Sequence, residues 1–125
     1  MSKILVVEDD VELASTLKAW LQLRKFTVQV VHTGEEASEQ LRFGEFDAVL
    51  LDWHLPDAEG IDICREFRGT GSTIPILMLS GNTSEQEREQ GLAAGATDYV
   101  TKPFDFDWLV KKLQTLVQDA GVQNQ

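Results

Sequence analysis

Acidic side chains follow two apolar runs of this chain, at positions where they could bind a cation or act as nucleophiles. Glu8 and Asp9 come directly after the run that ends at Val7, and Asp52 comes directly after the run 48–51. A carboxylate at the end of a buried strand is costly to desolvate unless it has a partner or faces an open crevice. Asp is also a favoured turn residue, so from this stretch alone Asp52 could equally cap the next turn.

A serine and a lysine follow two further apolar runs. Ser80 comes directly after the run 76–79, and Lys102 directly after 98–101. A lysine ammonium places a point charge on a phosphate oxygen, and a serine hydroxyl donates a hydrogen bond. Taken singly, a turn serine and a solvated surface lysine are the simpler interpretations. If the runs are strands of one parallel sheet, however, all these groups meet at one edge.

That convergence indicates phosphoryl-transfer chemistry. Clustered carboxylates repel one another, and one of them is forced neutral unless a cation intervenes. Two or three carboxylate oxygens suit Mg²⁺, which keeps several waters and pairs with phosphate. Phosphoryl transfer needs little more than position, a metal and positive charge on the equatorial oxygens, and a carboxylate can be the nucleophile. The central position of Asp52 favours it for that role.

The elements that must position these groups alternate regularly. Apolar runs predict strands at 3–7, 27–31, 48–51, 76–79 and 98–101, and 3.6-residue patterns predict helices at about 10–25, 33–43, 60–68, 84–94 and from 105 onward. Thr33 with Glu36, and Ser84 with Glu87, fit the capping box that opens a helix. The helix that follows Ser84 has a weak apolar face, so it should be the helix most free to shift.

Five strands that alternate with five helices predict an α/β fold with a parallel sheet covered on both faces. The expected class is a flavodoxin-like (βα)5 doubly wound five-stranded parallel sheet with strand order 2-1-3-4-5. In that order the chain reverses between strands 1 and 3, and ligands bind outside the carboxyl ends of the strands at such a reversal. The more polar run 27–31 should be an edge strand.

Composition sets limits on the class of protein. The 125 residues predict one domain at 1–119, followed at 120–125 by a polar C-terminal tail or the start of a linker. A net charge of −10 argues against binding of nucleic acid or an anionic membrane by this domain. Cys64 is the single cysteine, so no intrachain disulfide is possible. Without a membrane-length apolar run or a signal-peptide pattern, a cytoplasmic location is the default expectation.

Four separated motifs carry a resemblance to a known family. They are Val-Glu-Asp-Asp at 7–10, Leu-Leu-Asp at 50–52 with Leu-Pro at 55–56, Met-Leu-Ser at 78–80, and Gly-Ala-Thr-Asp-Tyr-Val-Thr-Lys-Pro-Phe at 95–104. Each motif alone is weak, but their order and spacing are highly specific. From Lys3 to about Val117 the chain resembles a receiver (response-regulator) domain of two-component signal transduction.

The resemblance implies a phosphorylated signalling domain rather than a turnover enzyme. Asp52 would accept a phosphoryl group from a sensor histidine kinase or phosphotransfer protein, and the domain would promote its own phosphotransfer and dephosphorylation with Mg²⁺. Glu8, Asp9, Asp52 and the backbone carbonyl of His54 would hold the metal, with Asp9 favoured over Glu8 as the direct ligand. The altered surface would regulate an output domain or partner, transcription being one such output.

The resemblance also implies a switch around the phosphoryl group. Ser80 matches a switch hydroxyl that is more often threonine in relatives, and Lys102 matches a lysine that contacts the phosphate. Tyr99 matches an aromatic residue that turns inward when the hydroxyl moves, although a half-buried core tyrosine needs no switch to explain it. The bond between Lys102 and Pro103 is expected to be cis.

A homodimer through the fourth helix, fifth strand and fifth helix is a further implication. Arg88, Asp98 and Lys112 fall at positions that form salt bridges in one class of receivers. Trp108 stands where a glutamate is usual, and Thr97 and Asp119 also depart from that pattern. An exposed Trp108 would anchor a more apolar contact, whereas the helical pattern of the last helix also allows Trp108 to face the core.

Three other functions fit the sequence less well. A Mg²⁺ phosphohydrolase with an aspartate nucleophile usually has a second aspartate two residues later, where this chain has His54. A nucleotide or flavin module is disfavoured because the loop after the first strand is acidic and has no glycine. A degenerate receiver that is never phosphorylated fits poorly with the complete set of matching positions.

Overall fold

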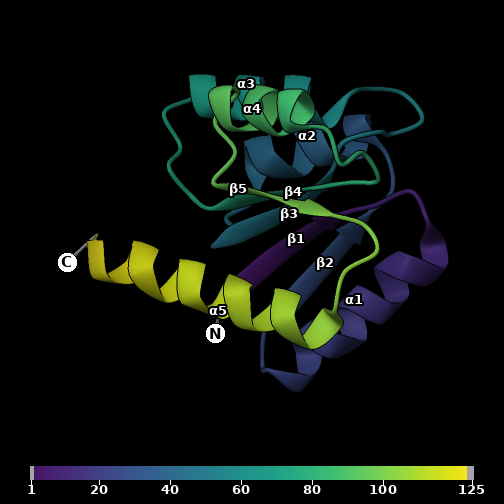
Figure 1. Ribbon diagram of the computed structural model, residues 1–125. Helices are drawn as coiled ribbons and strands as arrows, with labels where there is room; N and C mark the ends of the chain where they lie inside the picture. Colours follow the sequence, from purple (N-terminus) through teal and green to yellow (C-terminus); the bar gives the residue numbers. More distant parts are fainter. Residues whose placement is uncertain (1, 124–125) are drawn as a thin grey trace.

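Five parallel strands form the centre of the molecule. They are β1 (Lys3–Val7), β2 (Thr27–Val31), β3 (Ala48–Asp52), β4 (Ile76–Ser80) and β5 (Asp98–Thr101). The sheet order is β2-β1-β3-β4-β5, with β2 and β5 at the edges (Figure 1). This computed structural model describes residues 2–123, and it confirms the strand order and the fold class that the sequence predicts.

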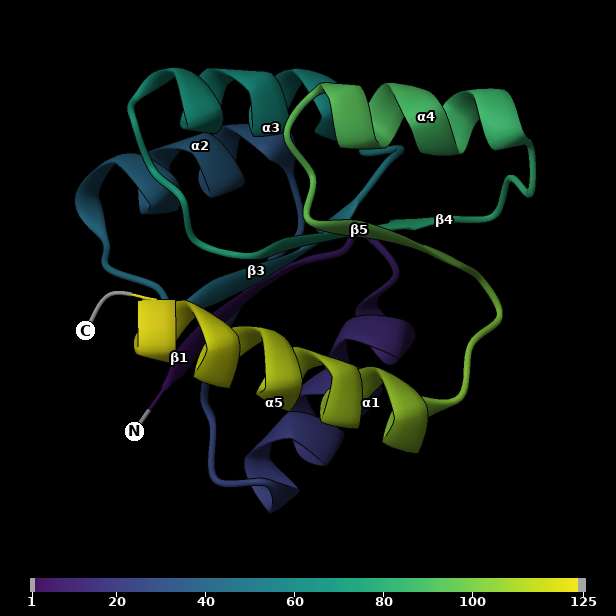
Figure 2. The same cartoon turned by 60° about the vertical axis from the view of Figure 1, so that its left-hand side comes forward.

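Helices cover both faces of the sheet. They are α1 (Val11–Leu23), α2 (Gly34–Phe43), α3 (Gly60–Gly69), α4 (Glu85–Ala93) and α5 (Phe106–Gln123). Two views show α1 and α5 on one face and α2, α3 and α4 on the other (Figures 1 and 2). Among residues 2–123, no helix combines the length and the apolar character needed to cross a bilayer.

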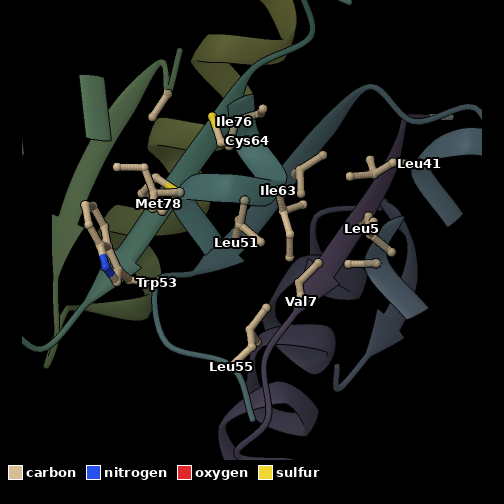
Figure 3. Close-up of a cluster of buried hydrophobic side chains, with 14 of the residues drawn as sticks. Leu5, Val7, Leu41, Leu51, Trp53, Leu55, Ile63, Cys64, Ile76 and Met78 are labelled. Atoms are coloured by element: carbon tan, nitrogen blue, oxygen red, sulfur yellow. The ribbon is translucent and has the colours of Figure 1, made fainter. Parts of the chain in front are cut away.

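The central strands are apolar on both sides because both sides are covered. Successive residues alternate between faces, so Leu5 and Val7 of β1 pack with α2 and α3, while Ile4 and Val6 pack with α1 and α5. Figure 3 shows the first of these two clusters, with Trp53 at its margin. The sheet therefore separates two cores, and the side chains at its carboxyl edge stand at the rim of both.

Helix α1 ends at Leu23, two residues before the predicted end at Lys25. Lys25 adopts a left-handed conformation with φ of 67°, its N–H donates to the Gln22 carbonyl, and the Phe26 N–H donates to the Leu21 carbonyl. This is a Schellman ending with lysine at the position that glycine usually takes. A 3.6-residue pattern cannot reveal it, because Lys has good helix propensity.

Helix α5 runs further than the sequence predicts. The polar segment from Gln118 onward is helical, and the helix continues to Gln123. No proline interrupts the segment, and Leu116 and Val117 in the preceding turn pack on the core. The predicted tail at 120–125 thus overlaps the helix, and residues 124 and 125 lie outside the described residues.

Gly60, the first residue of α3, lies against the backbone that follows β3. Its N–H donates to the Trp53 carbonyl at 2.6 Å. A Cβ built on Gly60 would clash with the Asp52 carbonyl oxygen and lie 3.1 Å from Trp53 Cα. Both obstacles are backbone atoms that no rotamer change can move. Glycine at this position therefore lets α3 start directly beside Asp52.

We expect Gly60→Ala to destabilise the domain by roughly 1–3 kcal/mol or more, because the added methyl group must displace the backbone of Asp52. Gly69→Ala is the matched control, since a Cβ at Gly69, the last residue of the same helix, meets nothing within 4 Å. The control should change stability by about 1 kcal/mol or less. Urea denaturation of both variants tests this, and equal stabilities would contradict the proposed clash.

Candidate functional site

Three carboxylates gather where β1 and β3 end. The two strands pair in parallel, with Val7 beside Leu51, so the residues that follow Val7 lie next to Asp52. Each of Glu8, Asp9 and Asp52 offers an oxygen, and these oxygens lie within 4.8 Å of one another. Asp52 is the last residue of β3 and not the first residue after it, because the strand runs one residue further than its apolar run. The structure thus brings together the acidic residues that the sequence singled out.

Lys102 joins this cluster from the end of β5. Its ammonium Nζ lies 2.6 Å from Glu8 Oε1 and 3.1 Å from Asp52 Oδ1. The Lys102 backbone N–H donates to the Ser80 carbonyl at 2.7 Å, which aligns the end of β5 with the end of β4. The peptide bond from Lys102 to Pro103 is cis. One cation therefore bridges carboxylates from two strands.

Burial sets the protonation of the cluster. Glu8 is fully buried, and desolvation raises its pKa from 4.5 to about 7 in spite of the opposing hydrogen bond from Lys102. Burial also raises the pKa of Asp52, against the influence of Glu8 and Lys102. At the exposed Asp9, hydrogen bonds with Glu8 and Asp52 outweigh desolvation and lower the pKa.

The Lys102 ammonium stays protonated, because its bonds to Glu8 and its attraction to Asp52 outweigh desolvation and raise its pKa. Near neutral pH the single positive charge of Lys102 thus does not balance the negative charge that remains on the three carboxylates. A small divalent cation with oxygen preference would relieve that repulsion. The structure fits such an ion by the chemistry of its donors: three carboxylates of two neighbouring strands around one point.

His54 lies in the loop after β3, two residues beyond Asp52. Its exposed imidazole Nδ1 is 3.2 Å from Glu59 Oε2, so the side chain takes part in a surface contact and not in the acidic cluster. The same loop is tied to α2 by Asp57, whose carboxylate accepts the N–H groups of Gly34 and Glu35 at 2.7 and 3.0 Å. Sequence reasoning did not identify this cap, since Asp57 is 23 residues from Gly34 and 22 from Glu35 along the chain.

Ser80 and Tyr99 lie side by side beneath α4. The Ser80 hydroxyl is buried; it accepts from the Asn82 N–H at 3.1 Å and donates to Glu87 Oε1 at 2.5 Å. Tyr99 is 8% exposed, and its hydroxyl lies 2.6 Å from the Asn82 carbonyl oxygen and 2.9 Å from Glu87 Oε1. Tyr99 thus faces inward, with its hydroxyl between Asn82 and Glu87.

Glu87 is a residue of this site that sequence reasoning missed. The capping box predicted at Ser84 forms only in part: Ser84 Oγ accepts the Glu87 N–H at 3.1 Å, but the Glu87 carboxylate turns to Ser80 and Tyr99. At the other predicted box the carboxylate does return, since Glu36 accepts from the His32 N–H and the Thr33 hydroxyl. The available signal was the weak apolar face of the helix after Ser84, where a buried polar contact replaces apolar packing.

The candidate dimer residues already pair within the chain. Lys112 Nζ lies 2.6 Å from Asp98 Oδ2, and Arg88 lies 3.5 Å from Glu85. Trp108 is 50% exposed, so the interpretation of Trp108 as a core residue is wrong. Its neighbour Leu109 takes the buried position instead, and the Trp108 ring receives the Lys112 ammonium at 5.5 Å from its centroid.

We expect the stability of the metal-free domain to fall as pH rises from about 4.5 to 7. Over that range native Glu8 keeps a proton that the unfolded chain has lost, so the unfolded state binds fewer protons. A shift of this size corresponds to roughly 3 kcal/mol. Urea denaturation with a chelator across this range tests it in the wild type and in Glu8→Gln. The variant should show a flatter profile, and parallel profiles would contradict the assignment.

Comparison with known proteins identifies the family. The sequence profile of the family described as "Response regulator receiver domain" matches residues 4–114. The response regulator MprA of Mycobacterium ulcerans is 39% identical over 122 residues, which cover 98% of this chain and 53% of that protein. The chain therefore spans about half the length of the curated relatives that it matches.

Solved structures agree with this match. The receiver domain of the Francisella response regulator 1452 superposes with a TM-score of 0.92 at 28% identity, and covers 96% of this chain and 99% of that one. The BeF3-activated DrrB receiver domain superposes with a TM-score of 0.87 at 32% identity, and covers 94% and 98%. The chain belongs to the response regulator receiver domain family of two-component signal transduction.

Proposed function

We propose that Asp52 is the phosphoacceptor of this receiver domain and that the donor is the phosphohistidine of a sensor histidine kinase or a phosphotransfer protein. The observation that carries the proposal is the convergence of Asp52, Lys102 and two further carboxylates at one edge of the sheet. Among these groups Asp52 is central, since its oxygens lie close both to the acidic cluster and to the ammonium of Lys102.

The reaction needs only these groups. A carboxylate oxygen of Asp52 attacks phosphorus, an O–P bond forms, and the N–P bond to the donor imidazole breaks. Lys102 offers positive charge to one phosphoryl oxygen, and the Ser80 hydroxyl offers a hydrogen bond to another. Mg²⁺ would be held by Glu8, Asp9, Asp52 and the His54 carbonyl, and when bound it neutralises charge on the transferred group.

The domain acts by its phosphorylated state rather than by turnover of a substrate. We infer that it also promotes the slow hydrolysis of its own acyl phosphate with Mg²⁺. The phosphorylated surface would then regulate an output domain or a separate partner, transcription being one such output. Because the related MprA proteins are about twice as long, an attached output domain is the first expectation. We also propose a cytoplasmic location. The net charge of −10 argues against direct nucleic-acid binding by this domain.

Asp52→Asn should abolish phosphorylation without unfolding the domain. The substitution keeps the shape of the side chain, removes the nucleophilic carboxylate and relieves repulsion in an acidic cluster, so the melting temperature should hold or rise. Intact mass after incubation with acetyl phosphate and Mg²⁺ measures the result, with one added phosphoryl group in the wild type and none in the variant. Asp62→Asn is the control, because the Asp62 side chain is exposed on α3, and this variant should be phosphorylated normally. Equal incorporation in Asp52→Asn would overturn the assignment.

Trp53 emission should report Mg²⁺ binding. The indole follows Asp52 directly, is buried, and meets the Tyr99 ring edge-on with 6.1 Å between centroids. A divalent ion at the carboxylates changes the local field strongly. Trp20 stacks on Phe106 in the α1–α5 layer, and Trp108 is half exposed, so neither should respond as strongly.

The controls for this titration are Trp53→Phe, which should lose the response, and Asp9→Asn, which should weaken it by removal of a hard oxygen ligand. An Asp9→Asn protein that titrates like the wild type at millimolar Mg²⁺ would show that the metal is held elsewhere.

We further propose a weak homodimer through α4, β5 and α5 that phosphorylation strengthens. Trp108 is an exposed large apolar residue on this face, and the pair of Asp98 with Lys112 would exchange partners across the interface. Sedimentation with beryllium fluoride and Mg²⁺ should show dimers in the wild type and at least several-fold weaker association in Trp108→Glu. A wild type that remains monomeric at high concentration with the mimic bound would refute this.

A further inference from the structure

Helix α4 is attached to the sheet by an unusually small and polar contact. Only Glu87 and Gly91 are buried among its residues, whereas α1 buries Ala14, Leu17 and Leu21. The two residues are four positions apart and share one face of the helix. That face therefore presents a carboxylate and a bare backbone to the sheet where other helices present aliphatic side chains.

The carboxylate of Glu87 meets the two hydroxyl groups on its side of the sheet. Glu87 Oε1 lies 2.5 Å from Ser80 Oγ on β4 and 2.9 Å from the Tyr99 hydroxyl on β5. The residue is 9% exposed, so these bonds form largely out of water. Hydrogen bonds to a charged acceptor in such surroundings are among the stronger ones in proteins. Glu87 Oε1 thus makes the polar attachment of α4 to the sheet.

Counting hydrogens shows how Ser80 is held. Ser80 Oγ accepts from the Asn82 N–H, so its own hydrogen is the one donated to Glu87. Tyr99 also has a single hydroxyl hydrogen, with two acceptors in reach: the Asn82 carbonyl oxygen at 2.6 Å and Glu87 Oε1 at 2.9 Å. Ser80 is therefore the firmly committed donor to the carboxylate, and Tyr99 can donate to either oxygen.

We propose that Glu87 is a positioning residue that latches the Ser80 hydroxyl to α4 and so opposes its movement toward a phosphoryl group on Asp52. The inference rests on the proposed function of Asp52. Because the Ser80 hydrogen cannot serve Glu87 and a phosphoryl oxygen at once, phosphorylation must break the bond between Ser80 and Glu87. The bond between Ser80 and Glu87 therefore lowers the stability of the phosphorylated state. When it breaks, α4 is released from β4.

The Tyr99 hydroxyl lowers the free-energy cost of this release. When Ser80 leaves, the Tyr99 hydrogen turns from the Asn82 carbonyl to Glu87 Oε1, so the buried carboxylate keeps a donor. Glu87 thus exchanges one hydroxyl partner for the other, and the polar link of α4 passes from Ser80 on β4 to Tyr99 on β5. The latch has two states with similar numbers of hydrogen bonds.

The test is the affinity of the domain for beryllium fluoride with Mg²⁺, a phosphoryl mimic, measured from Trp53 emission. Glu87→Ala removes the latch and should tighten binding about tenfold, as expected for loss of one charge-assisted hydrogen bond that opposes it. Glu87→Gln keeps the size of the side chain and a weaker acceptor, so it should give a smaller gain. Glu89→Gln, exposed on the same helix, should bind as the wild type does.

A second arm separates a latch from a general loosening of α4. In the Ser80→Ala background no hydroxyl remains to be held, so Glu87→Ala should add no further gain. A gain that persists there, or an unchanged affinity in both Glu87 variants, overturns the latch. Should Glu87→Ala fail to fold, Glu87→Gln with and without Ser80→Ala decides the question. A wild type that binds no mimic instead refutes the proposed function of Asp52.

Discussion

The packing of β1 against β3 is the constraint on which the rest of the site depends. Their register sets acidic residues from two strands at one point, and burial of those residues is unfavourable unless a cation is supplied. Lys102 supplies one from the end of β5, across the full width of β4. The ends of three strands, β1, β3 and β5, are thereby coupled through charge, and a phosphoryl group or a metal ion at this edge must alter the balance at each of them.

The two faces of the sheet differ in how firmly their helices are attached. On one face Trp20 of α1 stacks on Phe106 of α5, and leucines of both helices pack against the sheet. On the other face α2 and α3 also pack apolar side chains against the sheet, whereas the buried residues of α4 are Glu87 and Gly91. Under the proposed function, phosphorylation of Asp52 would act on α4 through Ser80 and Tyr99, whose hydroxyl groups both contact Glu87.

Much of the fold followed from the sequence because strands buried on both faces produce continuous apolar runs, and the order of the sheet then placed Asp52 and Lys102 at one edge. What escaped prediction depends on tertiary contacts. The left-handed Lys25 has no signature in its residue type. Glu87 satisfied a local capping pattern, while the partners of its carboxylate are Ser80 on β4 and Tyr99 on β5. Trp108 is one position away from the buried stripe of α5, and an aromatic side chain fits either interpretation of the pattern.

Gly91 has a mechanical consequence for α4. A Cβ at this position would lie 3.2 Å from Trp53 Cζ3 and 3.6 Å from Tyr99 Cδ2, so the helix backbone rests directly on two aromatic rings. Packing of ridges into grooves normally fixes the rotation and the translation of a helix, and a smooth backbone over flat rings provides neither restraint. At this contact α4 can slide or roll, because no side chain has to pass over an interlocked partner. The domain therefore combines a rigid framework with one helix that can move over a smooth contact, and a single methyl group on residue 91 would hinder that movement.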